Sequence, residues 1–514
     1  MQEPFHLVYS VRGDVRYVAV MRSVRKGGST RKEKVLYLGR ELDAERGIYK
    51  NKSLGIFAFD PLTMTCSPPP ADFVDMSRRR NAREELIVDF GDAFLFSELI
   101  SKYGLDPAID AIQYGNPDSL RALLLYYMLS TRSNSLALPW YEGSYARILY
   151  PKANLTSQRI SDLLSSIGRE DTLQRFFDAY LPILGADIKN GANVLVDSTG
   201  LPNCIRVPLT AVSNHNGIIS EEIRLIYVVQ QGSRLPIYMR YVPGNIVDAS
   251  TLVTTMKELK TMGVNTKFAI LDAAYLTEEG MQALRKEKIS FITRCPSNRR
   301  IYKDLVPAHL STLEASDNLA LDSAGRLFNG RTVYIKCVPV KNYMGMDLYA
   351  YIGKDMGTAA LESRQYAQRV YGSGEKLDRQ AFYAQQQLHG IFMLLSTRKV
   401  RAEELLSTYH VRQEIEQVFD ISKNYASLLP LYVEKEETFR GHLLLTFIAT
   451  AVLQRLQLEI RESKYSLDAI LTNMPNQHAK VFQNVVIPSE ACRVQNEIYK
   501  LLRIHPAKEY PRVA

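Results

Sequence analysis

The stretch from residue 193 to 296 constrains the fold most, because its hydrophobic pattern alternates between strands and helices in one definite order. The segments NVLVD, EIRLIYVVQ and PIYMRYV read as strands, followed by helix-like ASTLVTTMKELKTMG, strand-like KFAILD, helix-like TEEGMQALRKEK and strand-like SFITRC. Short runs rich in β-branched residues predict strands, whereas longer segments with one apolar side predict helices. The order predicts an α/β fold with a mixed sheet flanked by helices.

Three strands followed by helix, strand, helix and strand is the order of an RNase H-like core. We expect this core to span residues 191–296 and 396–460. The segment between them, 297–395, contains strand-like TVYIKCVPV, MDLYAYIG and GIFMLLST and helix-like AALESRQYAQRVY. We therefore expect a β-containing insertion subdomain that interrupts the core.

The remaining parts of the chain differ in pattern. Residues 1–60 alternate short apolar strands with glycine-containing turns, which predicts a small β-rich module. A linker is expected near Pro68 to Pro70, because consecutive prolines enforce extended backbone. Residues 82–190 read as a helical DNA-binding region and residues 461–514 as a C-terminal helical region.

The charge of the chain suits a polyanionic partner. The 514 residues contain 64 Lys and Arg against 55 Asp and Glu, a net charge of +9, and the pI is near 9.0. Basic residues cluster in Arg22 to Lys34, Ser77 to Arg83 and Thr293 to Lys303. Clusters of this kind are typical of a surface that follows phosphates, although solvated loops explain any single cluster equally well.

A helix that reads DNA is a second possible contact. In TSQRISDLLSSIG, Ser157 or Thr156 is in place to cap a short helix that displays Gln158 and Arg159. Plain core packing is the alternative for a short amphipathic helix with one arginine.

Cysteine usage and hydropathy indicate a reducing, non-membrane location. The five cysteines are odd in number and widely spaced, with no CxxC pair and no histidine at zinc-ligand spacing. The first residues have no apolar run of the kind a secretory signal needs. The most apolar stretch, Leu443 to Leu453, is far shorter than the ~20 residues that span a bilayer. We expect a cytoplasmic protein with a buried helix at this stretch and no membrane contact.

Two aspartates end apolar strands. Asp197 follows NVLV and Asp272 follows FAIL, which places both carboxylates at the ends of buried strands. Desolvation disfavours an acid there unless a positive charge compensates, and a divalent cation is the obvious partner. For either aspartate alone, accepting backbone hydrogen bonds is the better explanation.

The third acid lies in YHVRQEIEQVFDISKN. At helical spacing four functional side chains share one narrow face, namely Tyr409, Arg412, Glu416 and Lys423. Val411, Ile415 and Val418 project to the opposite side, which allows the helix to bury an apolar stripe. An exposed face with an ion pair between Arg412 and Glu416 accounts for those two residues but not for the other two.

These motifs resemble the insertion-sequence transposases of bacteria and archaea, the DDE enzymes marked by Y-x2-R-x3-E-x6-K. Tyr409, Arg412, Glu416 and Lys423 match that signature without a gap. The resemblance covers about 190 to 450 and includes VDSTG after the first strand, VPGNIVDAS before the first helix and ILDAAY at the second acid.

The resemblance implies a DNA transposase that cuts the ends of an insertion sequence and joins the 3′-OH ends to target DNA. Asp197, Asp272 and Glu416 would be the catalytic residues and would hold two Mg²⁺ ions, for which Mn²⁺ can substitute. Tyr409, Arg412 and Lys423 would contact the DNA backbone. The implied partners are double-stranded DNA with terminal inverted repeats, target DNA and a second copy in a synaptic homodimer, at the nucleoid.

One departure concerns tryptophan. Several relatives place a tryptophan in the insertion to stack on a flipped base, whereas the one tryptophan here is Trp140, in the helical region. Tyr334, Tyr349 or Tyr351 could take its place, or no such stacking occurs.

Two other functions share parts of this pattern. An RNase H-like nuclease that only hydrolyses DNA would carry the same three acids. A domesticated DNA-binding protein without catalysis would have no physical reason to keep the acids and the Tyr-Arg-Glu-Lys face together.

Overall fold

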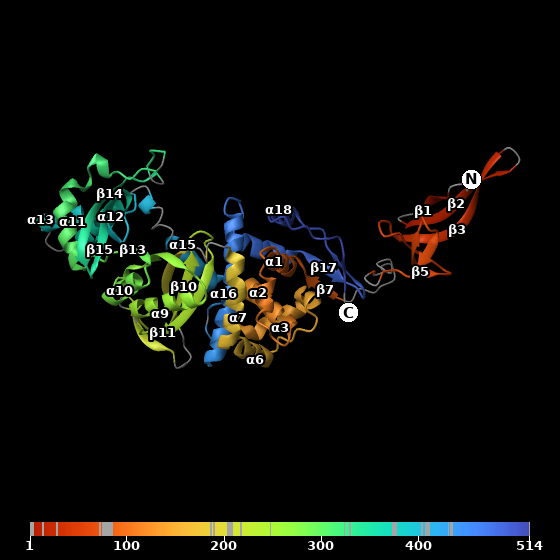
Figure 1. Cartoon of the computed structure of the whole chain (residues 1–514), viewed down its shortest axis with the longest axis horizontal. Coiled ribbons are helices and arrows are strands. Elements are labelled where there is room, and N and C mark those ends of the chain that lie inside the picture. Colours follow the sequence, from red (N-terminus) through yellow and green to blue (C-terminus); the bar gives the residue numbers. More distant parts are fainter. Residues whose placement is uncertain are drawn as a thin grey trace. The chain divides into compact units, whose positions relative to one another are not determined.

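The computed structural model describes residues 5–512, apart from 13–14, 27–28, 71–72, 74–85, 186–187, 189–190, 203–208, 216–217, 247, 323, 328–329, 373–377, 402–403, 407–411, 430 and 432–434 (Figure 1). Two compact units are distinguished by their internal contacts. One comprises residues 1–90, 476–495 and 505–514, and the other 91–475 and 496–504. Each is described by itself.

The first unit begins with a six-stranded antiparallel sheet in which every strand pairs with the next along the chain. Its strands are β1 (Phe5–Arg12), β2 (Val15–Lys26), β3 (Ser29–Asp43), β4 (Ile48–Asn51), β5 (Gly55–Asp60) and β6 (Thr65–Ser67). Val18, Val20 and Leu38 pack with Tyr49, Phe57 and Phe59 on one face. The sheet runs to Ser67, seven residues beyond the expected end of the module.

A second, four-stranded sheet includes part of residues 461–514, for which we expected a helical region. It is ordered β19 (Tyr510–Pro511), β18 (Val485–Pro488), β17 (His478–Val481) and β7 (Leu86–Asp89). Helices α17 (Leu467–Asn473) and α18 (Arg493–Leu501) and the short η7 (Met474–Asn476) fill only part of the segment. Strand β17 pairs with β7, almost 400 residues earlier, and a local pattern cannot reveal such a partner.

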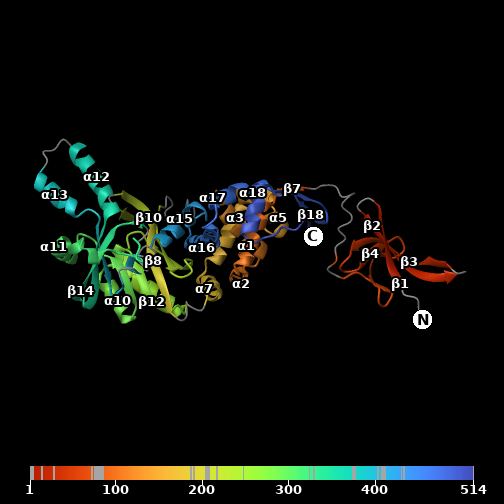
Figure 2. The ribbon, with the colours of Figure 1, turned by 90° about the horizontal axis from the view of Figure 1, so that it is seen from above.

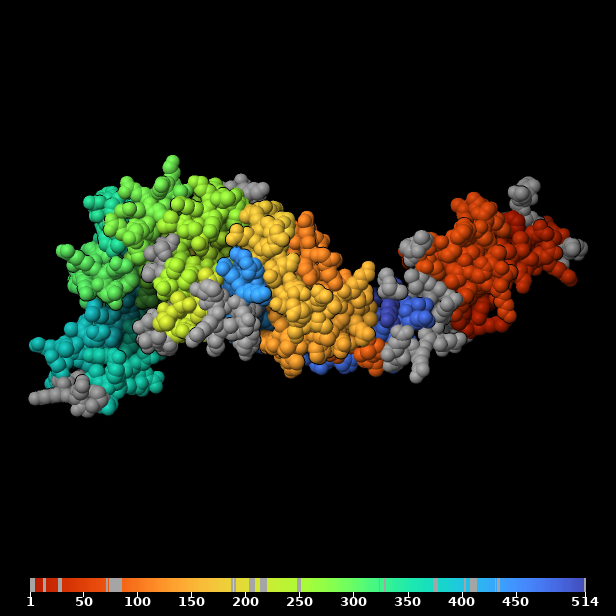
Figure 3. Space-filling model, turned by 90° about the horizontal axis from the view of Figure 1, so that it is seen from below, coloured from red at the N-terminus to blue at the C-terminus, as the bar shows by residue number. Residues whose placement is uncertain are grey.

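The second unit opens with helices over residues 91–184. They are α1 (Gly91–Lys102), α2 (Asp106–Asp110), α3 (Pro117–Leu129), η2 (Asn134–Leu136), α4 (Ala137–Gly143), α5 (Ala146–Leu149), α6 (Ser157–Ile167), α7 (Glu170–Tyr180) and η3 (Leu181–Leu184). They gather around α16 (Glu436–Ile460), as Figure 2 shows. In the space-filling view this orange and yellow region continues without a break into the green sheet region (Figure 3).

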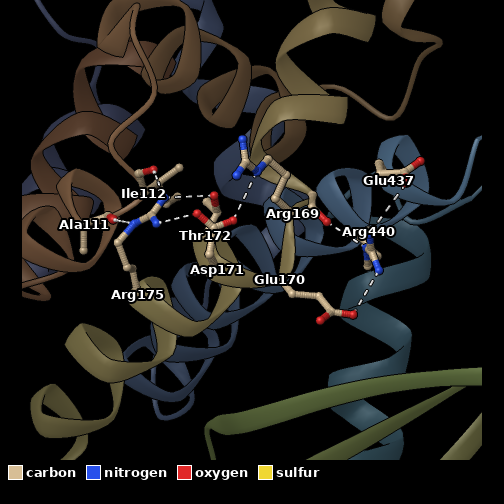
Figure 4. Close-up of polar contacts among 10 residues, drawn as sticks. Ala111, Ile112, Arg169, Glu170, Asp171, Thr172, Arg175, Glu437 and Arg440 are labelled. Atoms are coloured by element: carbon tan, nitrogen blue, oxygen red, sulfur yellow. Dashed lines mark hydrogen bonds and ion pairs between the residues drawn. The ribbon is translucent and has the colours of Figure 1, made fainter.

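Polar contacts tie α7 to its neighbours on both sides (Figure 4). Arg175 contacts Asp171 on α7 and donates to the carbonyl oxygen of Ala111. On the other side, Arg440 of α16 donates to the carbonyl oxygen of Gly168 at 2.7 Å and lies 3.5 Å from a carboxylate oxygen of Glu170. The helical region and α16 are therefore joined by charged groups as well as by apolar packing.

The predicted strand and helix order from 193 to 296 is confirmed. It consists of β8 (Ala192–Pro202), β10 (Ile218–Gln230), β11 (Pro236–Pro243), α9 (Asp248–Thr261), β12 (Thr266–Leu271), α10 (Glu278–Lys286) and β13 (Ser290–Arg294). The sheet order β11-β10-β8-β12-β13 places the parallel strands β8, β12 and β13 side by side, as in an RNase H-like core. Two short elements accompany it, β9 (Ala211–His215), which pairs with β10, and η4 (Ala273–Tyr275) after β12.

The insertion extends this sheet rather than forming a sheet of its own. It contains α11 (Arg300–Leu313), η5 (Ser316–Asn318), β14 (Val333–Tyr343), β15 (Met346–Asp355), α12 (Met356–Gly372), α13 (Arg379–Gln387) and β16 (Ile391–Ser396). Strand β16 pairs antiparallel with β13, and β15 and β14 follow outward. One mixed sheet of nine strands results.

The two faces of the core sheet pack against different helices. Val196 of β8 and Leu271 of β12 share an apolar core with Leu252 of α9 and Met281 of α10. The other face receives α15 (Arg412–Asn424) and α16. Helix α16 is long and apolar enough to cross a membrane, yet 78% of its most apolar window is buried within the protein, as expected of a core helix. The predicted burial of Leu443 to Leu453 is confirmed.

Candidate active site on two parallel strands

Asp197 and Asp272 come out of neighbouring parallel strands at the same level. The register pairs Val196 of β8 with Leu271 of β12, and each aspartate directly follows its member of that pair. Asp272 comes just after the end of β12, whereas Asp197 lies in the middle of β8, which corrects its expected place at a strand end. Adjacent strands lie about 4.8 Å apart, and successive side chains point to opposite faces. Because Val196 points toward α9 and α10, Asp197 points to the opposite face, where α15 lies. Asp272 lines a cavity at the end of β12.

Backbone contacts hold each aspartate in place. The amide of Ser198 donates to Asp197 Oδ1 at 2.8 Å. The carbonyl oxygen of Asp272 accepts a hydrogen bond from Thr293 Oγ1 of β13 at 3.0 Å, just before the chain turns into η4. The Asp197 carboxylate is thus held by the backbone of its own strand, and the backbone of Asp272 by the neighbouring strand.

Helix α15 packs on the aspartate face next to Asp197. Tyr227 of β10 is paired directly with Asp197 across the antiparallel ladder, so that both side chains share a face. The ring of Tyr227 packs against Phe419 of α15, with centroids 5.3 Å apart, and its hydroxyl accepts from Ser422 Oγ at 3.1 Å. Burial raises the pKa of Tyr227 to about 12, so this phenol is neutral at physiological pH.

Glu416 lies on the exposed side of α15, one turn before Phe419, while Ile415 and Val418 are buried. The predicted amphipathic arrangement is therefore present for these residues. Among the residues that the structure describes, no three His, Cys, Asp or Glu side chains are grouped closely enough to hold a metal ion. The fold puts Asp197 and Asp272 directly after paired positions of β8 and β12 and packs α15 beside Asp197, but Glu416 does not complete a group of three carboxylates among the described residues.

The donor types nevertheless fit a hard divalent cation. Asp197, Asp272 and Glu416 offer only carboxylate oxygens, the ligands that Mg²⁺ prefers, and two of them leave adjacent strands. The third is carried by a helix that packs on the same face of the sheet.

Lys423 is tied to the strand that carries Asp197. Its Nζ donates to Thr199 Oγ1 at 2.5 Å, and Thr199 lies two residues beyond Asp197 on the same face. Burial lowers the pKa of Lys423, and the negative charge of Glu222 on β10 opposes that shift. This lysine is therefore partly buried, although it lies in the last turn of α15.

Glu222 is a residue that the sequence pattern did not single out. It is 4% exposed, and two motif glycines make room for it. A Cβ at Gly200 of VDSTG would lie 2.2 Å from Glu222 Oε2, and a Cβ at Gly244 of VPGN would lie 2.4 Å from the Glu222 carbonyl oxygen. The two motif glycines were the signal in the sequence that another group packs closely against this site. Neither has a positive φ, so the close approach of Glu222 explains why glycine is needed there.

The other two members of the predicted functional face cannot be placed. Tyr409 lies outside the described residues, and Arg412 is the first residue of α15, its side chain also outside the description.

A cavity of about 860 Å³ opens beside Asp272. Its lining includes the cations Arg294 and Arg369 and the ring of Tyr366. Tyr366 stacks on Phe382, with centroids 5.3 Å apart at 29°, and the Arg369 guanidinium lies 5.5 Å from the centre of the Tyr366 ring. This cavity combines cations and an aromatic ring next to a candidate catalytic acid.

None of the three tyrosines named as stacking candidates lines this cavity. Tyr351 is 1% exposed and donates its hydroxyl to the carbonyl oxygen of Val400, so it cannot stack on a base. Tyr334 packs against the core of the sheet. Tyr366 was missed because only the folding of α12 over the edge of the sheet brings it near Asp272.

Helix α6 presents Gln158 and Arg159 to solvent, as expected. Thr156 occupies the N-cap position but makes no side-chain cap hydrogen bond, which corrects the predicted capping. Both Gln158 and Arg159 contact the carboxylate of Asp162 one turn later.

Comparison with known proteins places this geometry in a family. Residues 194–452, just over half of the chain, match the transposase DDE domain. No curated protein sequence matches the chain. Similar solved structures include a piggyBac transposase synaptic complex with hairpin DNA, with 13% identity over 75% of this chain and 79% of that one and a TM-score of 0.38. The Drosophila P element transposase strand transfer complex has 11% identity over 74% of this chain and 90% of that one, with a TM-score of 0.23. The chain belongs to the DDE transposases, enzymes that cleave and transfer DNA strands.

Proposed function

We propose that this transposase cuts the ends of an insertion sequence and joins the freed 3′-OH ends to target DNA, with Asp197, Asp272 and Glu416 as its catalytic, metal-holding residues. The observation that carries the proposal is the register of β8 and β12, in which the two aspartates follow directly paired residues of adjacent strands, with α15 packed beside Asp197. Two Mg²⁺ ions, or Mn²⁺ in their place, would activate the attacking oxygen and stabilise the leaving one.

The protein residues in this proposal bind and orient. The Ser198 amide and the sheet hold the Asp197 carboxylate toward the face of α15. Lys423, fixed by Thr199 two residues from Asp197, supplies a positive charge for a phosphate near the scissile bond. Tyr409 and Arg412 would contact the same backbone.

The cavity beside Asp272 suits the DNA end. Arg294 and Arg369 would pair with phosphates, and Tyr366 offers the aromatic surface that a base needs for stacking. We propose Tyr366 in the role for which relatives use a tryptophan. The variant Tyr366→Ala should then lose end cleavage while Tyr351→Phe does not, and equal cleavage by the two variants would remove Tyr366 from this role.

The proposed partners are duplex DNA with terminal inverted repeats, target DNA and a second copy of the chain in the synaptic complex. The helical region at 82–190 is proposed to bind DNA, and the site of action is proposed to be the cytoplasmic nucleoid. The net charge of +9 supports a nucleic-acid partner.

Incubation of labelled DNA from the ends of the encoding element with the protein and Mg²⁺ tests the proposal. Asp197→Asn, Asp272→Asn and Glu416→Gln should each abolish cleavage and leave end binding largely intact, because amides remove charge without removing volume. Asp420→Asn is the matched control, an exposed acid one turn after Glu416 on α15. Near-normal cleavage by any of the three variants would show that its acid is structural, and cleavage without joining to target DNA would favour the nuclease.

A further inference from the structure

The β2–β3 hairpin of the first unit extends beyond the rest of its sheet. Among the residues that the structure describes, β1 pairs with β2 as far as Phe5 with Arg22. Past that point β2 and β3 continue as a two-stranded ribbon, from the pair Ser23 with Lys32 to the pair Lys26 with Ser29. At about 3.4 Å per residue the ribbon reaches roughly 13 Å beyond the third strand. Figures 1 and 2 show this hairpin projecting from the sheet.

The ribbon is basic and carries no acid. The sequence SVRKGGSTRK, from Ser23 to Lys32, contains four cations and neither Asp nor Glu. Arg25, Arg31 and Lys32 are all exposed. Directly paired residues share a face and neighbours alternate, so Lys32 and Arg25 lie on one face of the ribbon and Arg31 on the other. Positive charge is thus available on both sides.

The basic character continues along the solvent face of the sheet. Lys34 pairs with Met21 and Tyr37 with Ala19, on the face opposite the core residues Val18 and Val20. Tyr37 is 48% exposed, and Lys34 Nζ lies 5.5 Å from the centre of its ring. Residues 1–67 contain twelve Lys and Arg against seven Asp and Glu, more than half of the net charge of the chain in an eighth of its length.

We propose that the β2–β3 ribbon enters the major groove of duplex DNA, while the adjoining face with Lys34 and Tyr37 lies along the phosphate backbone. The major groove of B-DNA, about 12 Å wide and 8.5 Å deep, admits a two-stranded β-ribbon. Cations on both faces then meet the phosphates of both groove walls. The identity of the DNA as the element end rests on the proposed function, whereas the mode of binding rests on the ribbon.

Binding of the full-length protein to labelled element-end duplex in EDTA, at a series of salt concentrations, tests the proposal. The variant Arg25→Gln/Arg31→Gln/Lys32→Gln should weaken binding and lower the slope of log K against log salt by about 0.9 for each lost phosphate contact, at most about 2.7. The matched control removes three positive charges elsewhere on the same sheet, at Arg46, Lys50 and Lys52. Unchanged binding by the ribbon variant, or equal losses in the two variants, would overturn the proposal.

Chemical footprinting distinguishes the groove. The wild type should protect guanine N7, a major-groove atom, from methylation, and the ribbon variant should lose that protection while its thermal unfolding matches the wild type. Protection of adenine N3 alone, in the minor groove, would contradict the assignment, as would equal competition by double-stranded RNA, whose deep, narrow major groove excludes a ribbon. Asp197→Asn should lose cleavage but keep the footprint, whereas the ribbon variant should lose the footprint. Failure of the catalytic proposal would therefore appear in the cleavage assay, and failure of the ribbon proposal in the footprint.

Discussion

Helices α6 and α16 cross at two glycines, and the crossing gives a quantitative prediction for Gly441→Ala. A Cβ at Gly441 would lie 1.9 Å from the Leu164 carbonyl oxygen, and one at Gly168 would lie 1.8 Å from the Glu437 carbonyl oxygen. Real Cβ atoms essentially never approach closer than 3.0 Å, so the helices would have to separate by at least about 1.1 Å at Gly441. Both obstacles are backbone atoms, which cannot rotate away.

The expected loss follows from three contributions. Overpacking of a tight contact costs typically 1–3 kcal/mol. Separation of the helices also stretches the 2.7 Å hydrogen bond from Arg440 to the Gly168 carbonyl oxygen, at about 1 kcal/mol. Alanine offsets part of this loss, because it favours a helix interior over glycine by roughly 0.5–1 kcal/mol. We expect Gly441→Ala to lower the free energy of unfolding by about 1–3 kcal/mol.

Urea unfolding followed by tryptophan fluorescence measures this loss. The one tryptophan, Trp140, packs against Tyr126 in the same helical region, with ring centroids 5.4 Å apart. Gly143→Ala is the control, since Gly143 lies in α4 with nothing within 4 Å of its Cβ position, and this change should be neutral or slightly stabilising. A Gly441→Ala midpoint at or above that of the wild type would refute the argument from close approach.

Three further changes probe the charged groups. Lys423→Met, which keeps the apolar part of the side chain, should lower the affinity for the element-end duplex and reduce the slope of log K against log salt by about 0.9. An unchanged slope would mean that Lys423 has only a structural role, through its hydrogen bond to Thr199. The negative charge of Glu222 raises the pKa of Lys423, so Glu222→Gln should let Lys423 lose its proton, and the protein lose DNA affinity, at a lower alkaline pH than in the wild type. The same pH dependence of DNA binding in both proteins would contradict this interaction between Glu222 and Lys423. Burial lowers the pKa of His442 to about 4, so the unfolded chain alone takes up this proton as pH falls from about 6.5 toward 4. The free energy of unfolding should fall in that window by up to about 1.4 kcal/mol per pH unit. Urea unfolding at a series of pH values should show a weaker pH dependence for His442→Gln than for the wild type. The same pH dependence in both proteins would exclude His442 as its source.

The sequence alone determined the features that depend on local pattern. Strand and helix periodicity predicted the order from β8 to β13, because the alternation of buried and exposed side chains is set by each element's own geometry. The same reasoning placed Asp272 directly after a buried strand and predicted that Leu443 to Leu453 is buried, whereas Asp197, expected at a strand end, lies in the middle of β8 because the strand continues to Pro202 through its pairing with β10. The chemistry of the acids and the Tyr-Arg-Glu-Lys spacing indicated the family that the domain match shows.

Only the tertiary structure decided which distant segments meet. The pairing of β16 with β13, which makes the insertion part of the core sheet, joins residues about one hundred positions apart, and the pairing of β17 with β7 joins residues almost 400 apart. Nothing in a strand's own periodicity names its partner, since register and neighbours are selected by burial over the whole fold. For the same reason the sequence could not place Glu222 against two motif glycines or Tyr366 beside Asp272, because side chains from separate elements meet there only after the sheet has formed.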